Sequence, residues 1–119
     1  MTYKDVLDRI LKIDEKIRLV SITDLNGKVT NSGHQVDVRN ILTYNESQLL
    51  LQLAVKTWKA RNPFKHKIGI GEYSIAVYEK LKRITVRLGN AHLAYLTTER
   101  EANHDKIVLE ILKIVNQEN

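Results

Sequence analysis

Two very short gaps in the second half of the chain restrict how it can fold. Runs rich in β-branched and aromatic residues predict strands over residues 71–79, 83–88 and 91–98. Three residues separate the first two runs, and a single Gly-Asn pair separates the last two. A parallel connection needs roughly a dozen residues or more. The three strands are therefore expected to be consecutive neighbours in an antiparallel sheet.

A second hairpin is predicted over residues 17–34. Its first strand, residues 17–23, is apolar and β-branched, and its second strand, residues 28–32, is more polar. Between them lie residues 24–27, which end in an Asn-Gly pair. This pair is a strong hairpin signal because both residues tolerate the left-handed backbone conformation.

Three stretches show the apolar spacing of amphipathic helices, namely residues 2–15, 44–61 and 104–116. The second should end at Asn62-Pro63, because a residue before proline avoids the helical region. Each helix begins beside residues that can cap its N-terminus. The candidate caps are Thr2 with Asp5 three positions on, Asn45 with Gln48, and Asn103.

The strands differ in pattern, and the difference predicts their places in the sheet. The first strand and the last are apolar on both faces, so they should be central, with helices above and below. Arg83, Thr85 and Arg87 alternate with apolar residues, which predicts one face open to water. The 28–32 strand should be an edge. The expected fold class is α+β, a five-stranded antiparallel sheet with helices on both faces in the order α-β-β-α-β-β-β-α, formed by residues 1–119 as a single domain.

Few chemical functions are indicated by motifs. The chain has 119 residues and no cysteine, which excludes disulfides, zinc–thiolate sites and cysteine nucleophiles and fits a reducing, cytoplasmic location. The four histidines lack metal-ligand spacing, and Gly69-x-Gly71 lacks the third glycine of a dinucleotide-binding loop. No run is long and apolar enough for a membrane span. We therefore expect that the protein is not an enzyme and that it has no catalytic residues, no metal site and no cofactor.

The second predicted helix is too apolar for a single contact. At 100° per residue, its apolar side chains between residues 49 and 58 cover roughly 240°. One part should pack on the sheet, and the excess, assigned to Leu51, Val55 and Trp58, needs another cover. A partner chain would provide it, since exposed apolar patches usually mark contact sites. The alternative is that residues 35–43, with Val36, Val38, Ile41 and Leu42, fold over this excess.

A basic cluster follows on the same helix, around Trp58 and Phe64. Basic residues between aromatic ones can hold phosphates and stack bases. A solvated helix end explains the same residues, so both interpretations stay open. The candidate basic patch consists of Lys56, Lys59, Arg61, Lys65 and Lys67.

Two segments, residues 20–30 and 84–96, together with the element order, resemble the roadblock/dynein-light-chain family, which has a profilin-like architecture. Asp24 and Gly27 match the Asp-x-x-Gly-like turn of its first hairpin, and Gly89 matches the glycine before its last strand. The richness in Lys, Ile and Asn is also similar to that of archaeal proteins.

The resemblance implies a protein-interaction module that dimerises through the second helix and the third strand and docks small GTPases or scaffold proteins. It implies no catalytic set. The candidate dimer interface is then formed by Leu51, Val55, Trp58, Tyr73 and Ile75. Two alternatives remain: a profilin- or PAS-like monomer that binds a small ligand or peptide, and a weak nucleic-acid-binding protein.

Overall fold

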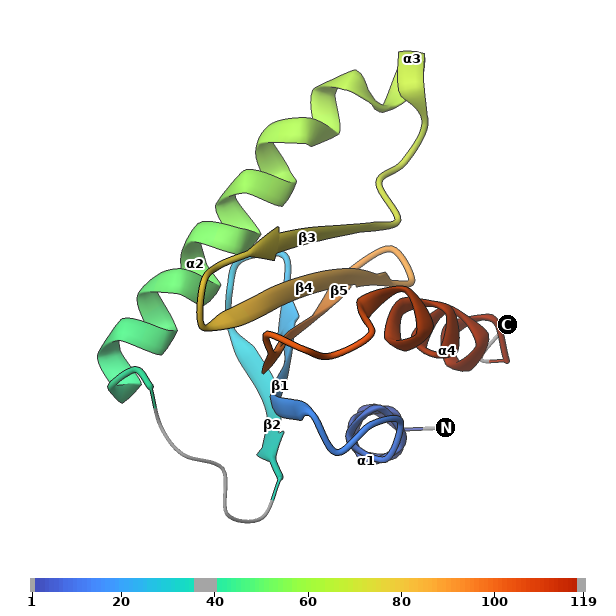
Figure 1. Ribbon diagram of the computed structural model, residues 1–119. Helices are drawn as coiled ribbons and strands as arrows, with labels where there is room; N and C mark the ends of the chain where they lie inside the picture. The colour runs from blue at the N-terminus through green and yellow to red at the C-terminus, as the bar shows by residue number, and fades with distance from the viewer. Residues whose placement is uncertain (1, 36–40, 118–119) are drawn as a thin grey trace.

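Five strands form one antiparallel sheet, as the hairpin signals predict. The computed structural model describes residues 2–35 and 41–117 (Figure 1). The sheet has the order β2-β1-β5-β4-β3, so β2 and β3 are its edges. The strands are β1 (Ile17–Asp24), β2 (Val29–His34), β3 (Tyr73–Val77), β4 (Leu81–Leu88) and β5 (His92–Glu99).

Helices cover both faces of the sheet, which confirms the predicted fold class and element order. Helices α1 (Tyr3–Leu11) and α4 (His104–Gln117) lie on one face, and α2 (Tyr44–Arg61) crosses the other (Figure 1). A short 3-10 turn, η1 (Asn62–Phe64), and a helical turn, α3 (Lys65–Ile68), extend α2 away from the sheet.

The two faces hold separate hydrophobic clusters because strand side chains alternate. On β5, Ala94 and Leu96 pack in the cluster shared with α1 and α4. Their neighbours Leu93 and Tyr95 pack in the cluster shared with α2. The predicted central position of β1 and β5 is thus confirmed, and so is the edge position of β2.

The start of α2 and the end of α1 differ from the sequence expectation. The cap of α2 is Thr43 and not Asn45: the Thr43 hydroxyl accepts a hydrogen bond from the Glu46 N–H, and Glu46 accepts one from the Thr43 N–H. Helix α1 stops at Leu11 instead of continuing to residue 15. Its last carbonyl accepts a hydrogen bond from the Gln35 side chain.

The end of α2 also differs. Asn62 keeps helical dihedral angles, φ −56° and ψ −38°, although it precedes a proline. Pro63 then occupies the first turn of η1, where its missing N–H has no partner to lose. The chain therefore remains helical to Ile68, seven residues past the predicted end at Arg61.

The polar face of β4 is covered and not open to water, contrary to the prediction. Thr85 is 5% exposed beneath α2. Arg83 donates a hydrogen bond through Nη1 to the Leu50 carbonyl of that helix, at 3.1 Å. Long basic side chains can cover apolar surface with their stems while the guanidinium finds an acceptor, so alternating polarity here marks a helix-covered face.

The turn between β1 and β2 gives a pH-dependent prediction. The Asp24 carboxylate accepts hydrogen bonds from the backbone N–H groups of Lys28 and Asn26, at 2.9 and 2.8 Å. These bonds hold the pKa of Asp24 below its ordinary value of 3.8. Their stabilisation is fully present above that value and is lost as the pH falls through the lower pKa of the folded state.

We therefore expect Asp24→Ala to be less stable than the wild type near neutral pH. The difference in unfolding free energy should shrink in acid, and urea unfolding followed across the acidic range measures it. A difference that stayed constant down to the lowest pH at which the protein folds would contradict the role of the Asp24 carboxylate.

Candidate interaction surface

The inward face of α2 consists of the three residues that were assigned to a partner chain. Leu51, Val55 and Trp58 are 2%, 4% and 8% exposed and pack with Leu93 and Tyr95 of the same chain. Their spacing of four and then three residues makes one continuous stripe, and the sheet covers it. This corrects the candidate dimer interface: these side chains are already buried inside the fold.

The two β3 residues of that candidate interface share one face of the strand. Ile75 pairs with Ile84 and packs against the cluster of α1 and α4. Tyr73 lies on the same face as Ile75 and is 46% exposed. Tyr73 nevertheless lines a hollow of about 140 Å³ together with Trp58 at the end of α2, and Ile75 borders the groove between α2 and β3.

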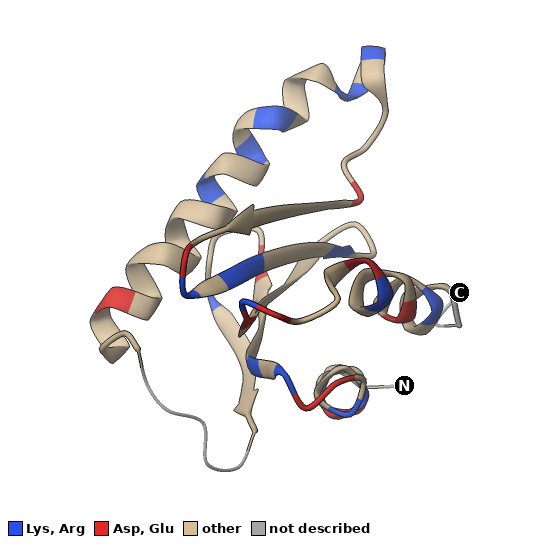
Figure 2. Ribbon diagram, in the orientation of Figure 1, with Lys and Arg blue, Asp and Glu red and all other residues tan. Residues whose placement is uncertain are grey.

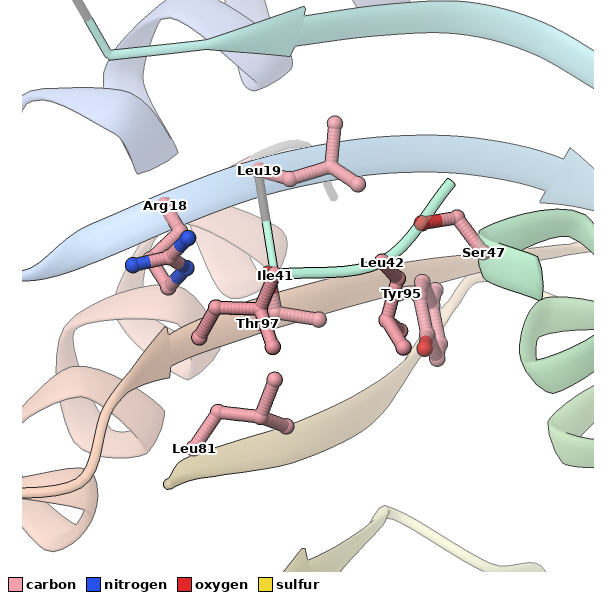
Figure 3. A pocket seen from close by; sticks show the side chains of 8 residues that line it. All are labelled: Arg18, Leu19, Ile41, Leu42, Ser47, Leu81, Tyr95 and Thr97. Atoms are coloured by element: carbon pink, nitrogen blue, oxygen red, sulfur yellow. The ribbon is translucent and has the colours of Figure 1, made fainter. Parts of the chain in front are cut away.

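The end of the connection before α2 covers the sheet and not the outer side of the helix. Figure 3 shows Ile41 and Leu42 above Thr97 and Tyr95. They line a hollow of about 50 Å³ together with Arg18, Leu19, Ser47, Leu81, Tyr95 and Thr97. Val36 and Val38, the other residues proposed as a cover, lie outside the described residues.

The apolar excess of α2 is real, but it lies on residues other than those expected. Leu49 and Leu53 are 70% and 50% exposed. On the flank next to Leu53, Ala54, Thr57 and Arg61 line a groove of about 110 Å³ between α2 and β3. The sequence shows that leucines are present here. Whether they point outward depends on which side of α2 packs on the sheet.

One flank of α2, turned toward β3, combines apolar, small and charged residues. At 100° per residue, its members fall within an arc of about 100°. We call it the α2 stripe; it consists of Glu46, Leu50, Leu53, Ala54, Thr57 and Arg61. Glu46 lies in the first turn of the helix and Arg61 in the last. Neither forms an ion pair with another described residue.

The predicted basic patch is exposed along the end of α2 and the following turns. All five residues, Lys56, Lys59, Arg61, Lys65 and Lys67, are exposed. Figure 2 shows blue bands along this part of the chain, with no acidic residue between the first turn of α2 and the loop before β3. Trp58, expected to contribute to the patch, is buried against the sheet.

Other hollows lined by the described residues are small. One of about 180 Å³ lies beside Trp58, Lys65 and Arg87. Ligand pockets usually span roughly 300–1,000 Å³. The described residues contain no cluster of three or more His, Cys, Asp or Glu side chains that could hold a metal ion. Within residues 2–35 and 41–117, no helix is both long and apolar enough to cross a bilayer.

Comparisons with known proteins identify the fold. No protein-family model matches the chain, and no curated protein matches it by sequence. Solved structures do match. A structure of MglB with a tetrameric arrangement has a TM-score of 0.78 at 16% identity, covering 96% of this chain and 82% of that one.

Two further structures extend the comparison. The roadblock/LC7 domain from Streptomyces avermitilis has a TM-score of 0.73 at 10% identity, covering 94% of this chain and 90% of that one. Profilin IA from Acanthamoeba castellanii has a TM-score of 0.60 at 11% identity, covering 98% and 95%. The resemblance carried by residues 20–30 and 84–96 is thus confirmed at the level of fold: the chain has the roadblock/LC7 fold, with profilin-like architecture.

Proposed function

We propose that the protein is a small non-catalytic interaction module that works as a homodimer. The observation that carries the proposal is the α2 stripe, which is self-complementary. An interface between identical chains related by a twofold axis must present the same patch on both sides. The stripe meets this condition when two α2 helices run antiparallel.

The register of such a pair follows from the order of residues along the stripe. Setting Leu53 against Ala54 of a second copy places Leu50 against Thr57 and Glu46 against Arg61. Each leucine then meets a smaller residue, which allows close packing. Each end of the pair gains an ion pair, so every member of the stripe has a complementary partner.

The free edge of β3 supports the same arrangement. Among the described residues, β3 pairs only with β4, so its outer backbone groups have no strand beside them. Exposed edges are sites for pairing with another chain. Because β3 borders the groove beside the α2 stripe, a second copy could contact helix and edge together.

The partner class comes from the resemblance. Roadblock-like domains are expected to dock small GTPases or scaffold proteins, and we propose a partner of this kind for the dimer. The small volume of the hollows that the described residues line weighs against the alternative of a monomer that encloses a small ligand.

A matched pair of leucine variants tests the dimer. Leu53→Glu should raise the dimer dissociation constant by about 100-fold or more, because the pairing buries carboxylates without partners. Leu109 is also an exposed helical leucine, 60% exposed, but lies on α4 in the opposite layer. Leu109→Glu should leave the dissociation constant unchanged. Light scattering across a concentration range measures both. Equal effects, or none, would remove the α2 stripe from the proposal.

A further inference from the structure

The excess positive charge of the protein is concentrated in one projecting segment. The chain carries 19 Lys and Arg residues against 14 Asp and Glu residues. Five of the basic residues, and no acidic residue, lie within residues 56–70, which we call the basic arm. The other 14 basic residues balance the 14 acidic ones. The arm therefore accounts for the whole formal charge of +5.

The basic arm also exposes apolar side chains at its far end. Phe64, Ile68 and Ile70 are 59%, 80% and 54% exposed. They lie in and just after η1 and α3, where the chain projects from the sheet (Figures 1 and 2). Lys65 and Lys67 lie between Phe64 and Ile68 along the chain. None of the five basic residues of the arm is ion-paired within the described part of the chain.

We propose that the basic arm binds the surface of an anionic lipid bilayer. Lysines near such a surface are attracted by the acidic headgroups, and exposed apolar residues beside them enter the boundary between headgroups and acyl chains. The arm presents both features together. Arg61 belongs to the α2 stripe, so the four lysines are the cations available to lipid, and Lys56 and Lys59 lie on the flank of α2 away from β3.

The exposed side chains favour a bilayer over a nucleic acid, the other large anion. Binding single strands commonly uses aromatic side chains on which bases stack. Trp58 is buried and unable to stack, so Phe64 is the one exposed Phe, Tyr or Trp ring within the basic arm. Ile68 and Ile70 offer bases neither hydrogen bonds nor an aromatic ring, whereas the acyl boundary of a membrane accepts aliphatic side chains.

Vesicle co-sedimentation with the full chain tests the proposal. The probes are vesicles of phosphatidylcholine mixed with phosphatidylglycerol, compared with vesicles of phosphatidylcholine alone. We expect binding to the mixed vesicles only, weakened by salt. Lys65→Gln/Lys67→Gln should lower the partition coefficient about 25-fold, which is about fivefold for each lysine.

Two further variants separate the contributions to vesicle binding. One separates the effect of the basic arm from that of net charge, and the other separates the charge of the arm from its apolar contact. Lys80→Gln/Lys106→Gln removes the same charge from exposed sites outside the arm and should change binding by less than about twofold. Phe64→Ser/Ile68→Ser alters only exposed side chains and should lower the partition coefficient by about tenfold or more. Circular dichroism confirms that each variant is folded.

Three outcomes would overturn the proposal. The first is no binding to the mixed vesicles at low salt. The second is an equal loss of vesicle binding in Lys65→Gln/Lys67→Gln and Lys80→Gln/Lys106→Gln, which would mean that net charge alone explains the binding. The third is binding of a single-stranded oligonucleotide that depends on Lys65 and Lys67, combined with vesicle binding indifferent to Phe64→Ser/Ile68→Ser. None of these results depends on whether the protein dimerises.

Discussion

Replacing Leu51 by alanine should lower the free energy of unfolding by about 2–5 kcal/mol, the range for a leucine deleted from a packed core. Replacing Leu53, two residues away, should change it by less than about 0.5 kcal/mol in the monomer. The reason is orientation: Leu51 is 2% exposed against the sheet, and Leu53 is 50% exposed on the opposite side of the helix. Urea unfolding of both variants measures the difference.

The two curves should be recorded at several protein concentrations. Self-association stabilises the folded state by an amount that depends on concentration. Any loss of unfolding free energy in Leu53→Ala should therefore appear only at concentrations where the protein associates. The loss in Leu51→Ala should persist at every concentration. Equal losses at high dilution would mean that α2 is rotated on the sheet, and would invalidate the α2 stripe.

Reversing the charge of Arg61 should weaken the dimer by about tenfold or more. In the antiparallel register, Arg61→Glu places two carboxylates together at each end of the helix pair. Combining it with Glu46→Arg should restore most of the affinity, because the swapped charges again face each other. The effect of the single variant should decrease in high salt, as expected for exposed charges. Sedimentation equilibrium of the variants measures the dissociation constants.

The helix cap must be considered in this experiment. Glu46 accepts a hydrogen bond from the Thr43 N–H, so Glu46→Arg also weakens the N-terminus of α2. The double variant keeps this defect, and any recovery of affinity must then come from the charges. Glu46→Gln, which can still cap the helix, is the matched control and should weaken the dimer less than Glu46→Arg. Failure of the double variant to recover would contradict the register.

The architecture was predictable because the decisive signals were local. Short gaps beside Lys80 and Gly89 left antiparallel hairpins as the only option, and apolar patterns on β1 and β5 placed them in the centre. The cap of α2 was missed although its signal was present. Thr43 precedes Glu46 by three residues, which is the capping-box spacing, but Asn45 offered a competing cap nearer the apolar run.

The orientation of α2 could not be predicted, because its apolar residues cover most of its circumference. Either the stripe of Leu51, Val55 and Trp58 or a stripe through Leu49 and Leu53 could have faced the sheet. The choice depends on tertiary packing against Leu93 and Tyr95, far along the chain. The packing of α2 on the sheet also covers the polar face of β4. Because this long-range packing could not be read from the sequence, both the orientation of α2 and the exposure of β4 were predicted wrongly.

The measurement that tests the account most directly is the solution molar mass of the wild-type protein. Size-exclusion chromatography with light scattering should be run across a concentration range. The account predicts a species of twice 13.8 kDa that dissociates on dilution, and it predicts that Leu53→Glu moves this dissociation to higher concentration while Leu109→Glu does not. A wild-type protein with a mass of 13.8 kDa at every concentration would contradict the proposed homodimer.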